Sequence, residues 1–370
     1  MKYIVCPDSF KDSMSAVDVC EIIAAKITER FPNAQVIKIP LSDGGEGFVA
    51  SLAIATQSEV EVVEVRDALL RPIDAHYLLL DEGKTAVLEL AQANGLEQIP
   101  INLRNPLKTS SYGTGKMIQH VLECGVSKII IGLGGSATND GGMGLLQALG
   151  ARFYDCFSQE LPGCGANLKK IENIDVSNID PRLQAVELII ATDVENLLLG
   201  KNGATWIYGP QKGATLEMCE KLESGMTHFA LKLEKLCQCD LTHCVGGGAA
   251  GGVGAVLIEL LRGKRVSGIE WLLDKVEFSQ KVMDTDIVIT GEGCVDLQTF
   301  NGKLVSGIIK MVESRNIKLI IMAGHVKDEA RKFENASIKM FQITPIGQKL
   351  KNALIYARVN LSECFNNFIK

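Results

Sequence analysis

The sequence has no run of basic residues and no apolar stretch that approaches the roughly 18 residues of a membrane-spanning helix. Its 38 Lys and Arg residues are outnumbered by 44 Asp and Glu residues, which gives a net charge of −6. These absences argue against a surface for nucleic acid or for an anionic membrane. The chain reaches Pro7 and Asp8 too early for a signal peptide. We therefore expect a cytoplasmic protein that binds neither nucleic acid nor membrane, and the sequence leaves its oligomeric state open.

The eleven cysteines follow no repeating spacing, so we interpret them as reduced thiols rather than as a disulfide framework. The densest group, at residues 237–244, matches no standard zinc finger. Apolar residues make up 46% of the chain and charged residues 22%, which is typical of a globular protein. A length of 370 residues indicates two domains.

Short apolar runs alternate with segments of helical periodicity along most of the chain. Continuous apolar strands that alternate with helices are typical of parallel sheets covered on both faces, so we predict an α/β fold. Between these runs, the segments 59–65, 77–80 and 86–90 resemble strands that are partly antiparallel. The predicted parallel strands are 3–6, 36–39, 129–131, 188–191, 286–289 and 317–322, and the clearest helices are 216–236, 249–261 and 303–312.

Ligands of open parallel sheets bind beyond the carboxyl ends of the strands. At least five predicted strand ends carry Gly, Asp, Ser or Thr, and together they favour a cleft that handles phosphate. They are Asp8-Ser9, Asp43-Gly44-Gly45, Gly134-Gly135-Ser136, Thr192-Asp193 and Gly291-Glu292-Gly293.

The glycine-rich run from Gly134 to Gly142 is the centre of this interpretation. Backbone N–H groups at a helix N-terminus form an anion site, and the hydroxyls of Ser136 and Thr138 add donors. No Walker A motif is present. Two glycine patterns, at 132–137 and 246–251, have the residue spacing of a dinucleotide-binding fingerprint. They keep an NAD(P)-dependent oxidoreductase as an alternative. Because Asn139-Asp140 would place a carboxylate at the mouth of the turn, we expect ATP with Mg²⁺ rather than NAD.

The motifs taken together resemble the bacterial type 1 glycerate kinases. They occur in family order along nearly the whole chain, although Asp12, Phe48 and Leu197 replace residues that are usual in the family. The motifs are Pro7 to Lys11, Asp43 to Gly47, Gly134 to Gly142, Thr192 to Val194, Gly209 to Ala214, Gly248 to Gly252, and Thr290 to Gly293 followed by Asp296, Gln298-Thr299 and Gly302-Lys303.

The resemblance implies transfer of the γ-phosphoryl group of ATP to D-glycerate, with 2-phosphoglycerate as the expected product and 3-phosphoglycerate as the alternative. It also implies two α/β lobes, with largely parallel sheets flanked by helices and a ligand cleft between the lobes. One lobe would combine residues 1–64 with 286–370, and the inserted lobe, 65–285, would carry the glycine-rich loops. A non-catalytic metabolite-binding protein remains a further alternative, because such lobes also serve as sensors.

Within this resemblance we assign roles to individual residues. Asp193 is the expected general base, oriented by Thr192 and Asn196, and Lys11 is expected to neutralise glycerate or phosphate. Asp296 is expected to bind Mg²⁺ and is our second choice for the base. The expected substrate- and phosphate-binding residues are Asp8, Ser9, Gly134, Gly135, Ser136, Thr138, Asn139, Arg71 and Arg104, and the expected metal ligands are Asp296, Glu292 and Asp43.

Overall fold

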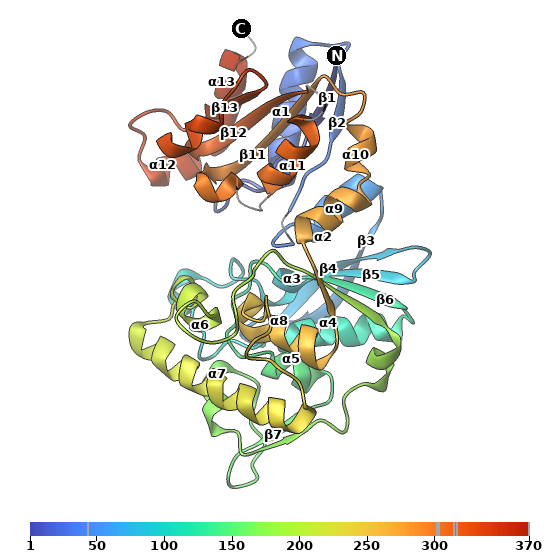
Figure 1. The fold of residues 1–370 in the computed structure, drawn as a ribbon, viewed down its shortest axis with the longest axis vertical. Coiled ribbons are helices and arrows are strands. Elements are labelled where there is room, and N and C mark those ends of the chain that lie inside the picture. Colours follow the sequence, from blue (N-terminus) through green and yellow to red (C-terminus); the bar gives the residue numbers. More distant parts are fainter. Residues whose placement is uncertain (43, 301–303, 314, 316, 369–370) are drawn as a thin grey trace. The chain divides into compact units, whose positions relative to one another are not determined.

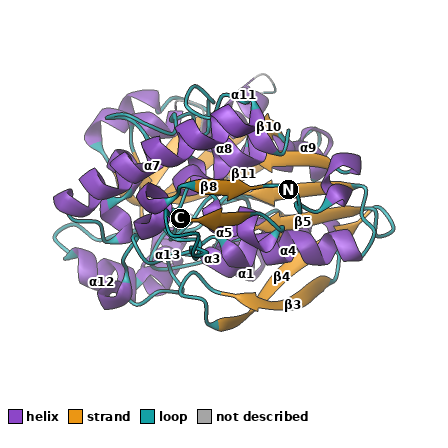
Figure 2. Ribbon diagram, turned by 90° about the horizontal axis from the view of Figure 1, so that it is seen from below, coloured by secondary structure: helices purple, strands orange, loops and turns teal. Residues whose placement is uncertain are grey.

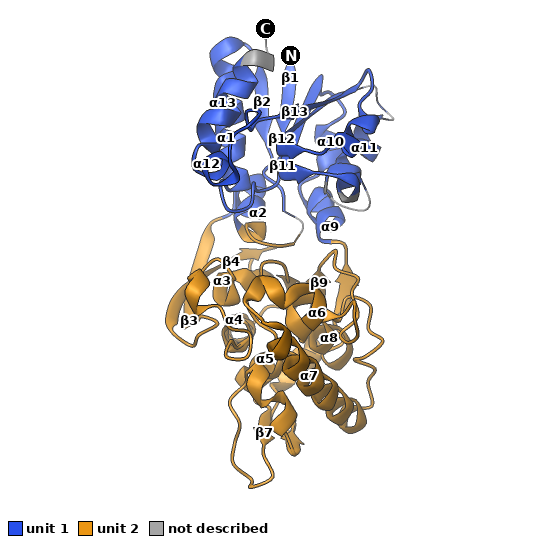
Figure 3. Ribbon diagram, turned by 90° about the vertical axis from the view of Figure 1, so that its left-hand side faces the viewer, with its two compact units in different colours: residues 1–43, 50–58, 268–370 blue, residues 44–49, 59–267 orange. Residues whose placement is uncertain are grey.

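A computed structural model of the chain describes residues 1–42, 44–300, 304–313, 315 and 317–368. The chain divides into two compact units, shown in blue and orange in Figure 3. Unit 1 comprises residues 1–43, 50–58 and 268–370, and unit 2 comprises residues 44–49 and 59–267. The expected division at 64/65 and 285/286 differs from this one in the placement of residues 44–49, 59–64 and 268–285. That division, and the expected cleft between the lobes, stay predictions.

Unit 1 is built on a five-stranded parallel sheet with the order β13-β12-β11-β1-β2. Within this unit, Figure 3 shows α1, α12 and α13 on one side of the sheet and α9, α10 and α11 on the other. The elements are β1 (Lys2–Val5), α1 (Ala16–Arg30), β2 (Gln35–Lys38), α9 (Gly268–Lys275), α10 (Phe278–Lys281), β11 (Ile287–Val295), α11 (Leu304–Glu313), β12 (Lys318–Val326), β13 (Ile338–Gln342), α12 (Leu350–Ile355) and α13 (Ala357–Phe368), with α2 (Phe48–Thr56) shared by the two units.

Local sequence accounts for both the start and the packing of α1 in unit 1. Ser15 caps α1 by accepting a hydrogen bond from the Asp18 N–H, which satisfies one of the free donors of the first turn. Ile23 and Ile27 of α1 pack with Val5 of β1 and Ile289 of β11 in one buried cluster. The helical spacing of these apolar residues therefore seats the helix on the sheet.

Unit 2 is built on a six-stranded mixed sheet with the order β10-β9-β6-β5-β4-β3. The strands β10, β9, β6 and β5 are parallel, whereas β5, β4 and β3 are antiparallel, as the sequence pattern predicted. The elements are β3 (Val60–Arg66), β4 (Pro72–Leu80), β5 (Thr85–Glu89), α3 (Leu90–Asn94), α4 (Tyr112–Glu123), β6 (Lys128–Gly132), α5 (Met143–Ala148), β7 (Arg152–Tyr154), β8 (Asn173–Asp175), β9 (Glu187–Ala191), α6 (Ala204–Tyr208), α7 (Leu216–Cys237), α8 (Val253–Ala255) and β10 (Lys264–Val266).

One face of the unit 2 sheet is covered by helices that form the largest buried cluster. Ile129 and Ile131 of β6 pack there with residues of α4, α5 and α7, while Ile130 between them is also fully buried. Burial of successive strand residues explains why the strand appears as a continuous apolar run in the sequence. The strands in orange and helices in purple in Figure 2, and the order of elements in Figure 1, confirm the predicted α/β class.

Three details of the fold differ from the sequence interpretation. The segment 249–261 is not one regular helix: it is a 3-10 turn (Ala249–Gly252), the short α8 and a π-helical turn (Val256–Leu260). The strands β11 and β12 continue beyond residues 289 and 322, with pairing up to Val295 and Val326. The strands β7, β8 and β10 have three residues each, too few to show a periodicity, and β13 is a further strand that was not predicted. Among the described residues, no helix is both long enough and apolar enough to span a membrane.

Candidate active site

The glycine-rich loop lies at the carboxyl edge of the unit 2 sheet. It follows β6, whose last residue, Gly132, is paired with Ala191 of β9 on one side and with Glu89 of β5 on the other. Asp193 follows Ala191 by two residues. The structure therefore brings the predicted loop and the predicted base to neighbouring strand ends, which is where parallel sheets bind their ligands.

Two other glycine clusters pack directly against this loop. The Gly134 N–H donates to the Gly44 carbonyl oxygen at 3.1 Å, and the Gly141 N–H donates to the Gly251 carbonyl oxygen at 3.0 Å. A Cβ atom at Gly134 would lie 2.2 Å from Gly45 Cα, and one at Gly251 would lie 2.0 Å from the Thr138 carbonyl oxygen. Much of the glycine in these motifs therefore serves the close approach of one backbone to another.

Asp140 does not lie where the sequence argument expected it. Its carboxylate is fully buried and accepts hydrogen bonds from the Ser111 N–H at 2.7 Å, the Ser111 hydroxyl at 2.8 Å and the N–H groups of Gly142 and Gly144 at 3.2 Å. The prediction of a carboxylate at the mouth of the turn is wrong, because these donors turn the side chain into the protein. Asp140 ties the loop to the start of α4 and α5.

The remaining predicted loop residues differ in their access to ligand. Thr138 and Asn139 are fully buried: the Thr138 hydroxyl donates to the Ala250 carbonyl oxygen at 3.3 Å, and the Asn139 amide donates to the Thr205 hydroxyl at 3.4 Å. Gly134 is half-buried, Gly135 is exposed and Ser136 keeps 6% of its surface. The segment Gly134–Ser136 is therefore the part of the loop that a ligand can reach, and ligand contact by Thr138 and Asn139 stays a prediction.

Lys212 is a candidate functional residue that sequence reasoning missed. It lies in the 3-10 turn Pro210–Lys212 and is only 3% exposed. Its ammonium donates to the Ser136 hydroxyl oxygen at 2.9 Å and to the Thr138 carbonyl oxygen at 2.7 Å. Burial lowers the pKa of Lys212 to about 7, although the negative charge of Asp140 opposes the shift. Its place in the motif Gly209–Ala214 was the only hint of a function in the sequence. The residues beside it do not indicate that its side chain contacts Ser136, 76 residues away.

The two predicted arginines belong to segments that pack on the loop. Ala137 of the loop lies in a small buried cluster with Ala68 and Ile99. The Arg104 guanidinium donates to the Ile99 carbonyl oxygen at 3.2 Å, and the Arg71 guanidinium pairs with the buried Asp67 at 2.6 Å. Both side chains thus have structural partners in unit 2, and their contact with a substrate carboxylate stays a prediction.

Asp193 is half-buried directly after β9. Thr192 is buried, and its hydroxyl oxygen accepts from the Val194 N–H at 3.3 Å. The Asn196 amide donates to the Asn202 carbonyl oxygen and accepts from the Tyr208 hydroxyl, both at 2.7 Å. Asn196 therefore stiffens the loop after β9, and the orienting contacts expected between these residues and Asp193 stay predictions.

The other predicted residues form a second group in unit 1. Asp8, Ser9 and Lys11 follow β1, and the Asp8 N–H donates to the Gly291 carbonyl oxygen of β11 at 2.8 Å. Lys11 is exposed, and its backbone nitrogen would lie 3.5 Å from a Cβ atom at Gly293. The first loop therefore lies along β11 beside Glu292.

One of the expected metal ligands occupies a position that differs from the sequence interpretation. Glu292 lies inside β11 and not after its end, because pairing with β12 continues past it. Asp296 follows β11 and pairs with Lys327 at 3.1 Å, which neutralises part of its charge. Asp43, the third expected ligand, and the motif residues Gly302-Lys303 lie outside the described residues. In the described part of the chain, no three His, Cys, Asp or Glu side chains gather in a way that would hold a metal ion.

Asp12, which stands where the resembled family usually has glycine, adopts a left-handed backbone conformation with φ of 62°. Glycine enters this region without strain, and aspartate is one of the few other residues that tolerate it. Aspartate is therefore compatible with the backbone conformation of the first loop at this position.

Comparison with known proteins shows the family to which nearly the whole chain belongs. A sequence model of the glycerate kinase family matches residues 3–370. This chain belongs to the glycerate kinase family. A glycerate kinase of Bacillus subtilis (strain 168) is 41% identical over 358 residues, which cover 96% of this chain and 94% of that protein. A glycerate 2-kinase of Escherichia coli (strain K12) is 41% identical over 329 residues, covering 89% and 86%.

A solved structure extends the likeness to the fold. A crystal structure assigned to glycerate kinase 2 from Salmonella typhimurium LT2 matches with a TM-score of 0.80 and 40% identity, and covers 100% of this chain and 97% of that chain. The predicted family and the predicted phosphotransferase class are confirmed. The oxidoreductase alternative has no support, and in this kinase the pattern at 132–137 leads into α5 only at Met143, too late for a dinucleotide turn.

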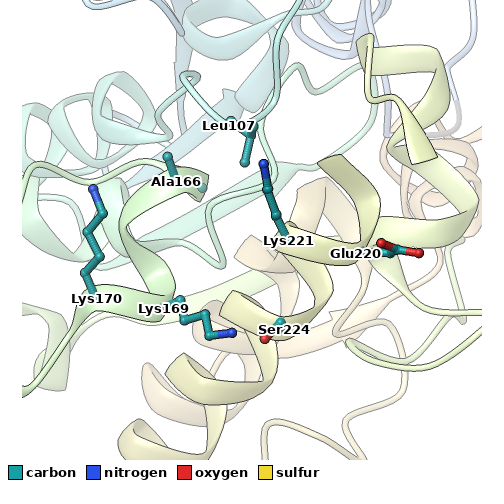
Figure 4. A pocket seen from close by; sticks show the side chains of 8 residues that line it. Leu107, Ala166, Lys169, Lys170, Glu220, Lys221 and Ser224 are labelled. Carbon is teal, nitrogen blue, oxygen red and sulfur yellow. The ribbon is translucent and has the colours of Figure 1, made fainter. Parts of the chain in front are cut away.

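A pocket of about 450 Å³ in unit 2 lies between the 3-10 helix Gly165–Lys170 and α7 (Figure 4). Lys169, Lys170 and Lys221 line it. Lys221 pairs with Glu217 at 2.6 Å and Lys170 donates to Asn167 at 3.0 Å, so two of the three ammonium groups already have partners. None of the predicted site residues of this kinase lines the pocket.

Glu89, at the end of β5, is a second buried ionisable group that sequence reasoning missed. Its two carboxylate oxygens accept hydrogen bonds from the N–H groups of Gly47 and Val49 at 3.0 and 3.1 Å. These groups lie at the start of α2, where the helix dipole favours a negative charge. Glu89 thus holds the Gly44–Gly47 loop of the kinase, yet burial raises its pKa to about 7.

Replacement of Glu89 by glutamine should change how the stability of the enzyme depends on pH. An acid whose pKa is higher in the folded state binds an extra proton there, so the free energy of unfolding falls as the pH rises from about 4.5 to about 7. The full loss is about 3 kcal/mol, and Glu89→Gln should lack it. Urea denaturation at several pH values measures the difference. The exposed Glu61→Gln is the control, and equal pH slopes in wild type and Glu89→Gln would refute the assignment.

Proposed function

We propose that this enzyme transfers the γ-phosphoryl group of ATP to D-glycerate and forms 2-phosphoglycerate. The observation that carries the proposal is the family match over residues 3–370, together with 41% identity to a protein named glycerate 2-kinase. Membership of a kinase family implies ATP as the phosphoryl donor. The cytoplasmic location, where ATP is abundant, is part of the proposal.

The residues present fit a phosphoryl ligand in unit 2. Gly134–Ser136 is the accessible part of a loop that is held rigidly by Gly44, Gly251 and Asp140, and the buried ammonium of Lys212 lies directly behind Ser136. Phosphoryl transfer requires positioning and charge stabilisation more than covalent chemistry. We propose that this segment binds an anionic group of the reactants and that Asp193 accepts the proton of the attacking hydroxyl.

The groups in unit 1 supply the remaining roles. Lys11 and Ser9 offer a cation and a hydroxyl donor in the first loop, and we propose that they bind a carboxylate or phosphate. Asp296 and Glu292, with Asp43, are the proposed ligands of Mg²⁺. Magnesium sites in kinases use one or two carboxylates with water and phosphate oxygens, so the lack of a three-carboxylate group among the described residues is compatible with this assignment. When bound, the ion would neutralise phosphate charge.

Phosphorus NMR of the product tests the proposed activity. The enzyme is incubated with D-glycerate, ATP and Mg²⁺, and the phosphoester signal is compared with authentic 2- and 3-phosphoglycerate. We expect ADP together with 2-phosphoglycerate. The signal of 3-phosphoglycerate would contradict the proposed position of transfer and retain the kinase, whereas no glycerate-dependent ADP release would contradict the kinase activity itself. Tight D-glycerate binding without ADP release would favour a metabolite-binding protein.

A further inference from the structure

Lys212 is a buried cation whose charge is not balanced by a contacting carboxylate. Within the described ranges, its ammonium bonds only neutral oxygens, those of Ser136 and Thr138, and forms no ion pair. Asp140 acts on it through space, but the oxygens of Asp140 already accept hydrogen bonds from Ser111, Gly142 and Gly144. A buried charge is costly unless it is paired, so this arrangement is incomplete until an anion comes near.

Ser136 connects this cation to the accessible part of the loop. Its hydroxyl oxygen accepts the hydrogen bond from Lys212 at 2.9 Å. A hydroxyl that accepts from an ammonium directs its own proton elsewhere. Ser136 keeps 6% of its surface and the preceding Gly135 is exposed, so an anion on Gly134–Ser136 meets the Ser136 hydroxyl first and the Lys212 charge behind it.

We propose that Lys212 is a positioning residue that fixes the Ser136 hydroxyl as a donor to an anionic group bound on Gly134–Ser136, and that Lys212 takes up a proton when this anion binds. The inference rests on the proposed function, because the anion is then the carboxylate of D-glycerate or a phosphoryl group of ATP. The proton passes from the buffer to the neutral amine of Lys212, which becomes an ammonium; no other bond forms or breaks.

The physical reason lies in the balance of burial against charge. Burial holds the pKa of Lys212 at about 7, so the side chain loses its proton readily in the free enzyme above neutral pH. An anion bound in front of Lys212 favours the charged ammonium and therefore raises the pKa of Lys212 again. Asp140 is the charged group that faces Lys212 from the loop, and it is present in both states. Uptake should therefore approach one proton at pH 8 and fall toward zero at pH 6.

The test measures proton uptake by the intact enzyme during ligand binding. Calorimetric titrations are made at pH 6 and pH 8 in pairs of buffers that differ in ionisation enthalpy. D-glycerate alone and a non-hydrolysable ATP analogue alone are the two titrants, which separates a carboxylate from a phosphoryl group as the anion. We expect the enzyme to take up close to one proton at pH 8 when it binds one of the two titrants. No uptake with either titrant would overturn the proposal, even if the enzyme phosphorylates glycerate normally.

Two variants assign the effect to these side chains. Lys212→Met keeps the length of the stem but carries no charge, so it should abolish the uptake and weaken binding about 10–100-fold, the range for a lost hydrogen bond to a charged group. Ser136→Ala should weaken the same ligand and reduce the uptake while Lys212 remains. Lys128→Met, at the start of β6 where Lys128 pairs with Glu187, is the matched control and should change neither. Persistent uptake in Lys212→Met would refute the proposal. If that variant does not fold, Ser136→Ala and the wild-type pH dependence decide it.

Discussion

Replacement of Asp193 by asparagine should lower kcat by about 10²–10⁴ and change KM only modestly, which is the usual range for a lost acid–base group. The side chain follows β9 at the carboxyl edge of the unit 2 sheet, next to the strand that leads into the glycine-rich loop. Asparagine keeps the shape of aspartate but cannot accept the proton of the attacking hydroxyl. Because that proton is released only as the phosphoryl group is transferred, the loss falls on the transition state.

The control for this prediction lies on the same loop. Glu195 is exposed two residues after Asp193, and Glu195→Gln should leave kcat unchanged. Initial rates over a range of D-glycerate and Mg²⁺ concentrations distinguish a base from a metal ligand, because excess Mg²⁺ should partly rescue Asp296→Asn but not Asp193→Asn. Near-native kcat in Asp193→Asn, or recovery at high Mg²⁺, would show that Asp193 is not the base.

Replacement of Gly134 by alanine should destabilise the protein by about 3 kcal/mol, the upper end of the usual cost of overpacking and large for a single methyl group. The new Cβ atom would lie 2.2 Å from Gly45 Cα and 2.9 Å from the Gly45 nitrogen. Both are backbone atoms, so no side chain can rotate away. The two loops must separate, which would also break the hydrogen bond from the Gly134 N–H to the Gly44 carbonyl oxygen and displace Ser136.

Gly293→Ala is the matched control for the clash. Its Cβ atom would have its nearest neighbour at 3.5 Å, an ordinary van der Waals distance. Alanine there should be neutral or slightly stabilising, since it restricts the unfolded chain. Urea denaturation followed by circular dichroism measures both variants. A Gly134→Ala protein with wild-type stability and activity would show that the two loops are not packed as described.

Glu89 and Lys212 give the carboxyl edge of the unit 2 sheet an unusual dependence on pH. Glu89 loses stabilising free energy as the pH rises from about 4.5 to about 7. The pKa of Lys212 is lowered in the folded state from 10.5 to about 7. Between these two pH values the unfolded state binds more protons, so the free energy of unfolding rises with pH. Their joint contribution is therefore smallest near neutral pH, where the proposed reaction takes place. An anion that binds next to Lys212 would offset part of this cost.

The sequence by itself determined the features that depend on local pattern. The runs 129–131 and 188–191 are continuously apolar because all their residues are buried in the sheet. The helical spacing of Ile23 and Ile27 places α1 on its sheet. The glycine-rich motifs in their order were sufficient for the family. Asp193 at a strand end also followed from local pattern, because the end of an apolar run marks the edge of a parallel sheet.

Only the tertiary structure decided where the polar groups of these motifs point. Asp140 turns inward because Ser111, 29 residues away, supplies two donors, and Glu292 lies inside a strand because β12 continues beside it. Lys212 reaches Ser136 across 76 residues, and Glu89 reaches Gly47 across 42. Burial and long-range hydrogen bonds set the direction and the pKa of each group. Neither is encoded by the residues beside it, so the motifs identified the family, and the fold identified the buried acid and the buried base at the carboxyl edge of the unit 2 sheet.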